Sequence, residues 1–527
     1  MHSNHWLYSW KTLVLASILF PPLGLVLVWL RPSSRLSRCI LNSIYISLLA
    51  FFYLYQFAGL HVERDGSGWK PMFSFEKGGE AHDVALERNR ARHAQLPLSQ
   101  PSAEDVSSTA PTSTPEPLKS PAAPPTQPSS PAAEPKRIPK SPSAYWTDFR
   151  GPKRDGVYDE MDILTTWPAQ GLPQLWKQPV GGGYASFVAA GGRAFTIEQR
   201  RSQEVVAAYD LETGRELWTN SWDADFRESM GGDGPRATPT WHESRVYALG
   251  ALGELRCLDA RTGKLLWNRN ILSDAQTGNV QWGMSAAPLV VDDKVIVLPG
   301  GRPGKSVVAY NKDTGSVAWR ALDDKQAYTS PVLVTLAGQR QILMVSAQRV
   351  AGLAPEDAKL LWDYPWVTSY DVNSSQPLVI GENRVFISAG YGHGAALIEV
   401  THSGDSFSAK LLWQNVNMKN KFNSSVYYQG HIYGLDEAIL SCVDANTGER
   451  KWKGGRYGYG QLLLASGHLI VLTESGEVVL VKATPESHME VSRFSALQGK
   501  TWNNPALANG RLLVRNTTEM ACFRIGK

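Results

Sequence analysis

The stretch AYDLETGRELW, Ala208–Trp218, is one copy of a unit that this chain repeats. The same spacing recurs at Cys257–Trp267, Ala309–Trp319 and Cys442–Trp452. Each copy begins with a small residue, has Asp or Asn two positions later, then Thr-Gly, and ends in Trp. A fifth stretch, Gly352–Trp362, keeps the interval but lacks the Thr-Gly pair. Self-similarity with a period of about 40–50 residues is typical of a solenoid or a propeller.

One copy of the unit predicts a hairpin. An apolar alternating run ends at Asp210, whose side chain can accept hydrogen bonds from the backbone of a turn. Gly214 supplies the positive φ that a tight turn needs, and a second strand begins at Glu216. A hairpin cannot bury both of its faces alone, so we expect Trp218 to lie at the seam between neighbouring sheets.

The region from Tyr145 to Lys527 divides into eight strand-rich units, each with apolar alternation broken by Gly, Asp or Asn. The last unit stops near Ile525 without a final Trp-bearing strand, whereas QLWKQPV, Gln174–Val180, is an unpaired Trp strand before the first unit. We therefore predict an all-β, eight-bladed β-propeller over residues 145–527, closed by this N-terminal strand. Seven blades remain an alternative, because the fifth and seventh units are degenerate.

Composition excludes some classes of function. A net charge of +4 offers no electrostatic case for nucleic-acid binding. The 18 Trp and 46 Gly suit a β protein with many turns. Cys257, Cys442 and Cys522 occupy matching places in different repeats, so we expect separate buried thiols rather than a disulfide framework.

Residues 1–60 contain two apolar runs, at about 12–30 and 39–58, each long enough to cross a bilayer. Positive charge between the two runs comes from Arg31, Arg35 and Arg38. By the positive-inside bias this loop is cytoplasmic, which predicts a transmembrane hairpin with the propeller on the periplasmic side of the cytoplasmic membrane. Arg64, Lys70 and Lys77 after the second run argue weakly against this orientation. A cleaved signal peptide is the alternative for the first run.

Two further segments precede the propeller. Residues 61–95 are polar, and AHDVALERNRARHAQ, Ala81–Gln95, has the composition of a helix. Residues 96–144 are rich in Pro, Ala and Ser and cannot bury enough apolar area to fold. We interpret them as a disordered linker, which at ~3.1 Å per residue spans at most roughly 140 Å.

The AxDxxTGxxxW pattern resembles the pyrroloquinoline-quinone (PQQ) repeat of quinoprotein dehydrogenases and of non-catalytic relatives, among them the lipoprotein of the outer-membrane barrel assembly machinery. DFRGPKRDG (Asp148–Gly156), GGDGPRATPT (Gly231–Thr240) and GYGHGAAL (Gly390–Leu397) resemble membrane-anchored or exported bacterial PQQ-like propellers. The resemblance implies an eight-bladed propeller outside the cytoplasm. Cys39 lies in SRCI between the two apolar runs and not in a lipobox, which differs from the assembly lipoprotein.

For a quinoprotein, the resemblance implies a Trp that stacks on the quinone, Ca²⁺ held by carboxylate and amide oxygens, and an Asp base. The sequence has no adjacent Cys pair and no recognisable ordered Glu, Asn and Asp set for calcium. We therefore expect no cofactor, no catalytic residues and no metal, with PQQ and Ca²⁺ as the alternative.

The loops that lead into the innermost strands of a propeller converge on one axial mouth. In this chain those loops are rich in aromatic and polar residues. The candidate binding residues are Tyr184, Asp233, Arg236, Trp282, Lys325, Tyr328, Tyr370, Asp371, Asn373, Lys421, Asn423 and Trp502.

The chemistry of these residues suggests three kinds of contact. Asp371 with Asn373 can ligate a cation, Trp282 or Trp502 can stack on a planar ligand, and the cationic side chains can pair with carboxylates. The alternative is that all of them hydrogen-bond the loops together around a water-lined funnel.

Three hypotheses follow. The first is a membrane-tethered scaffold that binds other envelope proteins without catalysis. The second is a PQQ- and Ca²⁺-dependent oxidoreductase, and the third is a module that binds a small ligand at the propeller axis.

Overall fold

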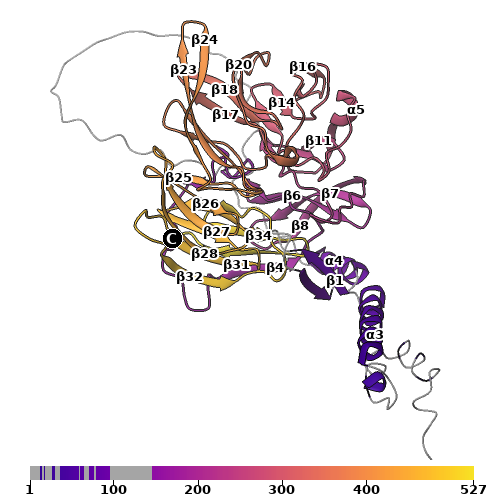
Figure 1. The fold of residues 1–527 in the computed structure, drawn as a ribbon. Helices are drawn as coiled ribbons and strands as arrows, with labels where there is room; N and C mark the ends of the chain where they lie inside the picture. The colour runs from indigo at the N-terminus through magenta and orange to yellow at the C-terminus, as the bar shows by residue number, and fades with distance from the viewer. Residues whose placement is uncertain are drawn as a thin grey trace, which may run out of the picture.

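The computed structural model describes residues 26–29, 36–57, 60–64, 71–75, 79–94 and 145–527, together with the single positions 12, 14 and 17. Strands from residue 157 onward form a ring of eight sheets, and two helices lie to one side of it (Figure 1). The predicted linker, residues 96–144, lies outside the described residues.

Each blade is an antiparallel sheet of four strands, which follow one another from an innermost strand at the axis to an outermost strand at the rim. Blades 1 and 2 consist of β5 (Val188–Ala190), β6 (Arg193–Arg200), β7 (Gln203–Asp210), β8 (Glu216–Asp223), β9 (Thr240–His242), β10 (Arg245–Leu249), β11 (Glu254–Asp259) and β12 (Leu265–Asn270). Blades 3 and 4 consist of β13 (Leu289–Val291), β14 (Lys294–Val297), β15 (Val307–Asn311), β16 (Val317–Ala321), β17 (Val332–Leu336), β18 (Gln339–Val345), β19 (Arg349–Leu353) and β20 (Leu360–Pro365). Two short helices, α5 (Ile271–Ala275) and the 3₁₀ turn η1 (Ser369–Asp371), lie between blades.

The second half of the ring follows the same plan. Blades 5 and 6 consist of β21 (Leu378–Ile380), β22 (Arg384–Ala389), β23 (Gly394–Ser403), β24 (Ser406–Asn415), β25 (Val426–Tyr428), β26 (His431–Asp436), β27 (Ile439–Asp444) and β28 (Arg450–Arg456). Blade 7 consists of β29 (Gln461–Ala465), β30 (His468–Leu472), β31 (Glu477–Lys482) and β32 (Glu490–Ser495), with β3 (Val157–Tyr158) added in parallel to β29. Blade 8 consists of β33 (Ala506–Ala508), β34 (Arg511–Arg515), β35 (Glu519–Arg524) and β4 (Gln174–Pro179).

The ring is closed by the strand predicted for that role. β4 precedes blade 1 in the chain but pairs with β35 as the outermost strand of blade 8, and Trp176 lies opposite Cys522. This arrangement confirms the eight-bladed propeller and excludes seven blades. Joining the first and last parts of the chain in one sheet leaves blade 8 with the full set of four strands.

The repeat builds the seams between blades as the sequence predicts. In blade 2, Asp259 Oδ1 accepts from the backbone N of Thr262 at 2.7 Å and Gly263 has φ +73°, which forms the tight turn. Trp218 of blade 1 lies on that turn and its Nε1 donates to Ala260 O at 3.0 Å. A Cβ on Gly263 would lie 2.5 Å from the Trp218 ring. The glycine is therefore required twice, for its backbone conformation and for the close approach of the indole.

The small first residue of each repeat faces the Trp of the same blade. Cys257 lies opposite Trp267, Cys442 opposite Trp452 and Cys522 opposite Trp176, each next to a β-bulge. All four cysteines are buried and free, which confirms separate thiols rather than disulfides.

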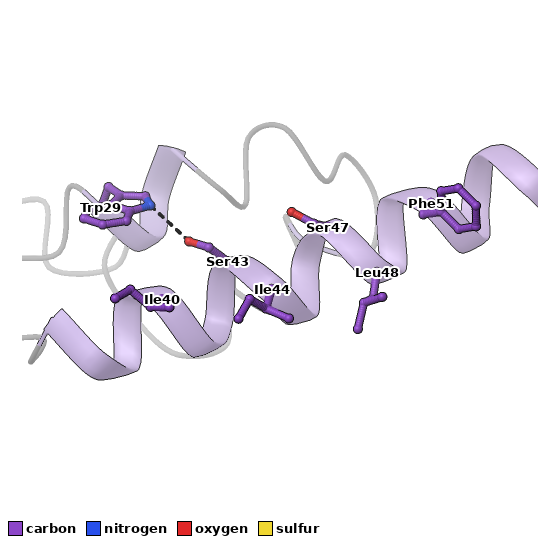
Figure 2. Close-up of a pocket in the computed structure, with 7 residues that line it drawn as sticks. All are labelled: Trp29, Ile40, Ser43, Ile44, Ser47, Leu48 and Phe51. Carbon is purple, nitrogen blue, oxygen red and sulfur yellow. Dashed lines mark hydrogen bonds between the residues drawn. The ribbon is translucent and has the colours of Figure 1, made fainter. Parts of the chain in front are cut away.

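The N-terminal part contains α3 (Leu36–Phe57), the hairpin of β1 (Leu60–Arg64) and β2 (Pro71–Phe75), and α4 (Gly79–Ala94). The helix predicted at 81–95 is thus present, whereas the apolar run at 39–58 coincides with α3. Figure 2 shows one face of α3, where Trp29 Nε1 donates to Ser43 Oγ at 3.0 Å beside Ile40 and Ile44. Within the described ranges, no helix is both long and apolar enough to cross a membrane. Most of the run at 12–30 lies outside them, so the transmembrane hairpin stays a prediction.

Candidate functional site

All twelve predicted residues lie in loops that lead into the innermost strands, three to eight positions before β5, β9, β13, β17, β21, β25 or β33 begins. These loops share one end of the propeller because every innermost strand runs in the same direction along the axis. Ten of the twelve residues take part in contacts around that mouth, and two point into the wall.

On one side of the mouth, aromatic rings and a guanidinium from blades 8, 1 and 2 stack together. The Tyr184 and Trp502 ring centroids are 5.7 Å apart. The Arg236 guanidinium carbon lies 5.2 Å from the Tyr184 centroid, and its nitrogens donate to Gly232 O and Gly234 O at 2.6 Å. Burial lowers the pKa of Arg236, while the nearby Tyr184 hydroxyl and Glu228 oppose this effect. Asp233 instead pairs with Arg227 at 3.0 Å.

On the facing side, loops of blades 3, 4 and 5 contribute a second group. The Trp282 and Tyr328 rings are 5.4 Å apart, and burial raises the pKa of Tyr328 to about 12. Lys325 forms an ion pair with Asp371 across the neighbouring blades. The Tyr370 ring meets the Tyr391 ring edge to face at 6.4 Å.

Four residues outside the predicted set complete the circle: Tyr391, Phe422, Tyr459 and Lys500. The Lys421 ammonium lies 4.7 Å from the ring centroids of both Tyr391 and Tyr459. The Phe422 ring lies 5.4 Å from Tyr459 and 4.8 Å from Trp502, which leads back to Tyr184. The Lys500 ammonium lies 4.6 Å from the Trp502 centroid. Adjacency to predicted residues was the available signal for Phe422 and Lys500, whereas Tyr459 lies in the degenerate seventh unit.

We call this set the mouth ring. It comprises Tyr184, Arg236, Trp282, Lys325, Tyr328, Tyr370, Tyr391, Lys421, Phe422, Tyr459, Lys500 and Trp502. Three cations of the mouth ring, Arg236, Lys421 and Lys500, lie over aromatic rings, where the ring quadrupole attracts positive charge.

Asn373 and Asn423 are buried in the wall below the mouth ring. Asn373 Nδ2 donates to Ser346 O at 2.8 Å and Trp366 O at 3.3 Å, while Asn423 Oδ1 accepts from Asn420 at 3.2 Å. The carboxylate of Asp371 is thus paired with Lys325, whereas the side-chain amide of Asn373 donates to backbone carbonyls. The cation-ligand hypothesis for this pair stays a prediction. Among the described residues, no group of three or more His, Cys, Asp or Glu is arranged to hold a metal.

A belt of hydroxyl and amide groups joins the innermost strands beneath the ring. Ser186 N donates to Thr238 Oγ1 at 2.9 Å, Ser330 N to Gln376 Oε1 at 2.7 Å, and Gln376 N to Ser424 Oγ at 3.0 Å. Each bond links two neighbouring blades. Not every polar group near the axis is satisfied in this way, because Asn373 Oδ1 and Asn423 Nδ2 are buried without a hydrogen-bond partner among the described residues.

The other end of the axis is closed by DFRGPKRDG, Asp148–Gly156, which we call the axial plug. Arg154 is buried and donates to Pro331 O at 2.8 Å, to Thr240 Oγ1 at 3.1 Å and to Asp148 at 2.9 Å. Arg150, also buried, donates to Ser425 O at 2.8 Å and Leu462 O at 3.2 Å. Because this short segment contacts blades 2 and 4 and also blades 6 and 7, it crosses the axis. Burial lowers the pKa of Arg150 to about 10.

The mouth is accessible where its backbone is strained. Tyr370 is 83% exposed and its neighbour Val367 is 62% exposed. Tyr370, Asp371 and Tyr391 have φ of 64°, 60° and 55°, the left-handed region that residues other than glycine seldom adopt. Such strain costs free energy and clusters at binding sites in proteins, so these loops are the part of the mouth best suited to contact a partner.

Comparison with known proteins shows similarity to one family of outer-membrane assembly proteins. The family model described as outer membrane protein assembly factor BamB matches residues 201–454. The BamB of Burkholderia pseudomallei is 22% identical over 363 residues, which cover 59% of this chain and 88% of that protein.

Quinoproteins match over a shorter stretch. Quinohemoprotein alcohol dehydrogenase ADH IIB of Pseudomonas putida is 34% identical over 123 residues, which cover 22% of this chain and only 17% of that enzyme. The crystal structure of quinohemoprotein alcohol dehydrogenase from Comamonas testosteroni superposes with a TM-score of 0.55 at 15% identity, and covers 73% of this chain and 81% of that chain. This last likeness concerns the fold alone.

Repeat, fold and comparisons together define the class: the chain has the fold and the repeat of a PQQ-like β-propeller, and the BamB family model matches it over residues 201–454. Within this class, the BamB type matches along most of its own length, whereas the quinohemoprotein dehydrogenase matches along a small part of it.

Proposed function

We propose that this chain is an extracytoplasmic scaffold that binds or assembles other envelope proteins, tethered to the cytoplasmic membrane by its N-terminal apolar segments. The observation that carries this proposal is the exposed, strained aromatic rim of the mouth ring around Tyr370 and Tyr391. The scaffold acts by binding alone, without PQQ or a metal.

The rim has the composition of a protein-binding surface. Tyr, Trp and Arg are enriched among the residues that dominate binding energy at protein interfaces, and the mouth ring consists largely of these types. Tyr370 presents most of its ring to solvent although its backbone is strained. A partner that covers this ring would gain apolar contact on a side chain that is already held in place.

The relatives support a protein partner. Proteins named for outer-membrane assembly match this chain along most of their length, and we extend that role to this chain as a proposal. The partners we propose are other envelope proteins, in particular those that assemble the outer membrane.

The tether is supported by α3. Leu41, Ile44 and Leu48 are 70%, 55% and 64% exposed on this helix, which is an unusual amount of apolar surface to leave in water. The arginines that precede α3 are consistent with a cytoplasmic loop and a periplasmic propeller.

Site-specific photo-crosslinking in living cells tests the scaffold. A benzoylphenylalanine at Tyr370 should give an adduct with an outer-membrane assembly protein, identified by mass spectrometry. The matched control is the same residue at Leu266, an exposed apolar position on the outer strand β12. Equal adducts from both positions, or none from position 370, would contradict a scaffold that binds through the mouth.

The second candidate is a PQQ- and Ca²⁺-dependent oxidoreductase, favoured by the local 34% identity with a quinohemoprotein alcohol dehydrogenase. Calorimetric titration with PQQ, with and without Ca²⁺, separates the two functions. The scaffold predicts no binding at high micromolar PQQ. Tight Ca²⁺-dependent binding that is lost in Asp371→Ala would favour the oxidoreductase.

A further inference from the structure

A polar helix near the N-terminus lies against the propeller wall where the ring closes. α4 contacts both β4, the last strand of blade 8, and β8, the last strand of blade 1 (Figure 1). His82 Nε2 is 2.9 Å from Val180 O, and Asn89 Nδ2 donates to Gln178 Oε1 at 3.2 Å. Leu86 is only 4% exposed. The helix therefore covers the seam at which the first and last blades meet.

Charge on α4 complements charge on blade 1. Arg90 Nε donates to Glu216 Oε1 at 2.8 Å, and Arg201 Nη2 donates to Glu87 Oε1 at 2.9 Å. Glu216 also accepts from Arg200 at 2.6 Å, so it lies between two guanidinium groups. One pair joins a base on the helix to an acid on the blade, and the other joins an acid on the helix to a base on the blade. This exchange of charges fixes the register of the helix on the wall.

The contacting residues of α4 follow the period of a helix. Positions 82, 86, 87, 89 and 90 lie on one side of the helix at spacings of three or four residues, and this side is turned toward the propeller. The helix has no continuous apolar stripe of its own, and a short isolated helix is marginal in water. Docking is thus what stabilises α4.

This contact changes the interpretation of the linker. α4 ends at Ala94, before residues 95–144, and the chain resumes at Tyr145 and Trp146 against the propeller, where Trp146 O accepts from Ala189 N at 2.8 Å. Both ends of residues 95–144 are therefore attached to the propeller. The sequence-based hypothesis treated this segment as a spacer between the N-terminal helix and the propeller, but its length does not separate those two parts.

We infer that α4 is a clasp: it fixes the N-terminal part of the chain to the seam of blades 8 and 1, so that the length of the linker does not set the distance between α4 and the propeller. This inference is independent of what the propeller binds. Where α3 is the tether proposed above, the clasp sets the height of the mouth ring above the membrane.

Electron–electron distance measurements on the full chain test the clasp. The four native cysteines are buried, so nitroxide labels introduced at the exposed positions Ala85→Cys and Lys482→Cys report one distance. We expect a narrow distribution in the otherwise unchanged chain. Deleting residues 108–132 should leave it unaltered, because the clasp and not the linker determines the distance.

The decisive variant breaks only the docking face. Leu86→Asp with Arg90→Glu should broaden the distribution and move it to longer distances. Arg88→Glu, the same charge change at an exposed position on α4, should have no effect. Circular dichroism of the strands shows whether the blades remain folded in each variant. A broad distribution before mutation, or a distance that follows linker length, would overturn the inference.

Discussion

A buried carboxylate between blades 1 and 2 links stability to pH at the scale of a single residue. Glu204 on β7 is fully buried, and its Oε1 accepts from Ala251 N at 2.7 Å. Burial raises its pKa from 4.5 to about 7; nearby Glu254 acts in the same direction, whereas the Ala251 hydrogen bond and Arg256 oppose it. Because the pKa is higher in the folded than in the unfolded chain, the contribution to stability is complete below about pH 4.5 and is lost as pH rises to about 7.

Glu204→Gln should remove this dependence. The free energy of unfolding of the native chain should fall by on the order of 3 kcal/mol between pH 4.5 and pH 8 through this group, since tenfold in proton affinity corresponds to about 1.4 kcal/mol. The variant should match the native chain near pH 4.5 and exceed it in stability at pH 8. Urea unfolding at both pH values measures this. An identical difference at the two pH values would show that Glu204 does not titrate as described.

Single residues also show where sequence patterns were informative. Gly263 and Trp218 could be assigned to a turn and a seam because their spacing repeats and the geometry is local. Tyr459 and Lys500 could not, since their role depends on rings brought from other blades.

The hairpin turn and the indole that lies on it are the unit of assembly at the scale of elements. Trp176, Trp218, Trp267, Trp413 and Trp452 each donate through Nε1 to a carbonyl of the next blade, at 2.8 to 3.1 Å. The worn repeat in blade 4 breaks the pattern on both of its sides. Trp319, which precedes it, has a buried Nε1 without a hydrogen-bond partner in the part of the chain that the structure describes, and Trp362 donates instead to Gln341 of its own blade at 2.6 Å. Loss of the Thr-Gly pair in blade 4 therefore coincides with loss of the indole hydrogen bond from Trp319 in blade 3.

The turn positions predict opposite effects in two blades. Gly263→Ala places a Cβ 2.5 Å from Trp218 at φ +73°, so we expect a loss of about 2–4 kcal/mol in unfolding free energy. Ala358 occupies the equivalent position in blade 4 at φ +58°, and Ala358→Gly should raise the unfolding free energy by up to about 1 kcal/mol. Thermal unfolding of both variants checks this. Destabilisation by both would mean that blade 4 no longer uses the shared turn.

At the scale of the whole molecule, the chain holds its ring together twice, at the rim through β4 and at the axis through the plug. Arg154 donates to groups of blades 2 and 4, and Arg150 to groups of blades 6 and 7, so two side chains connect opposite sides of the propeller. A buried guanidinium is costly unless fully hydrogen-bonded, and here carbonyls, Thr240 and Asp148 supply acceptors. The plug thereby joins the blades to one another across the axis.

Removing one of these arginines should affect the entire ring. Arg154→Ala leaves buried carbonyls without donors and should lower the unfolding free energy of the propeller by about 3–5 kcal/mol. The matched control is Lys153→Ala, whose side chain is 70% exposed and should matter by less than about 1 kcal/mol. Tryptophan fluorescence during urea unfolding measures both. Equal effects of the two substitutions would contradict a role of the plug in uniting the blades.

The sequence by itself determined the repeat, the Trp–Gly seam and the strand that closes the ring, because each depends on local spacing and on an alternation of apolar residues that the chain repeats. It predicted eight blades but left seven open, and the pairing of β4 with β35 in the tertiary structure decided between them. It also located the mouth, since loops before innermost strands must converge. Only the tertiary structure decided that Arg150 and Arg154 cross the axis, that Asn373 points into the wall while Asp371 pairs with Lys325, and that α4 returns to the propeller before the linker begins. These arrangements join residues from different blades, up to about 300 positions apart, through single contacts that leave no periodic trace in the chain.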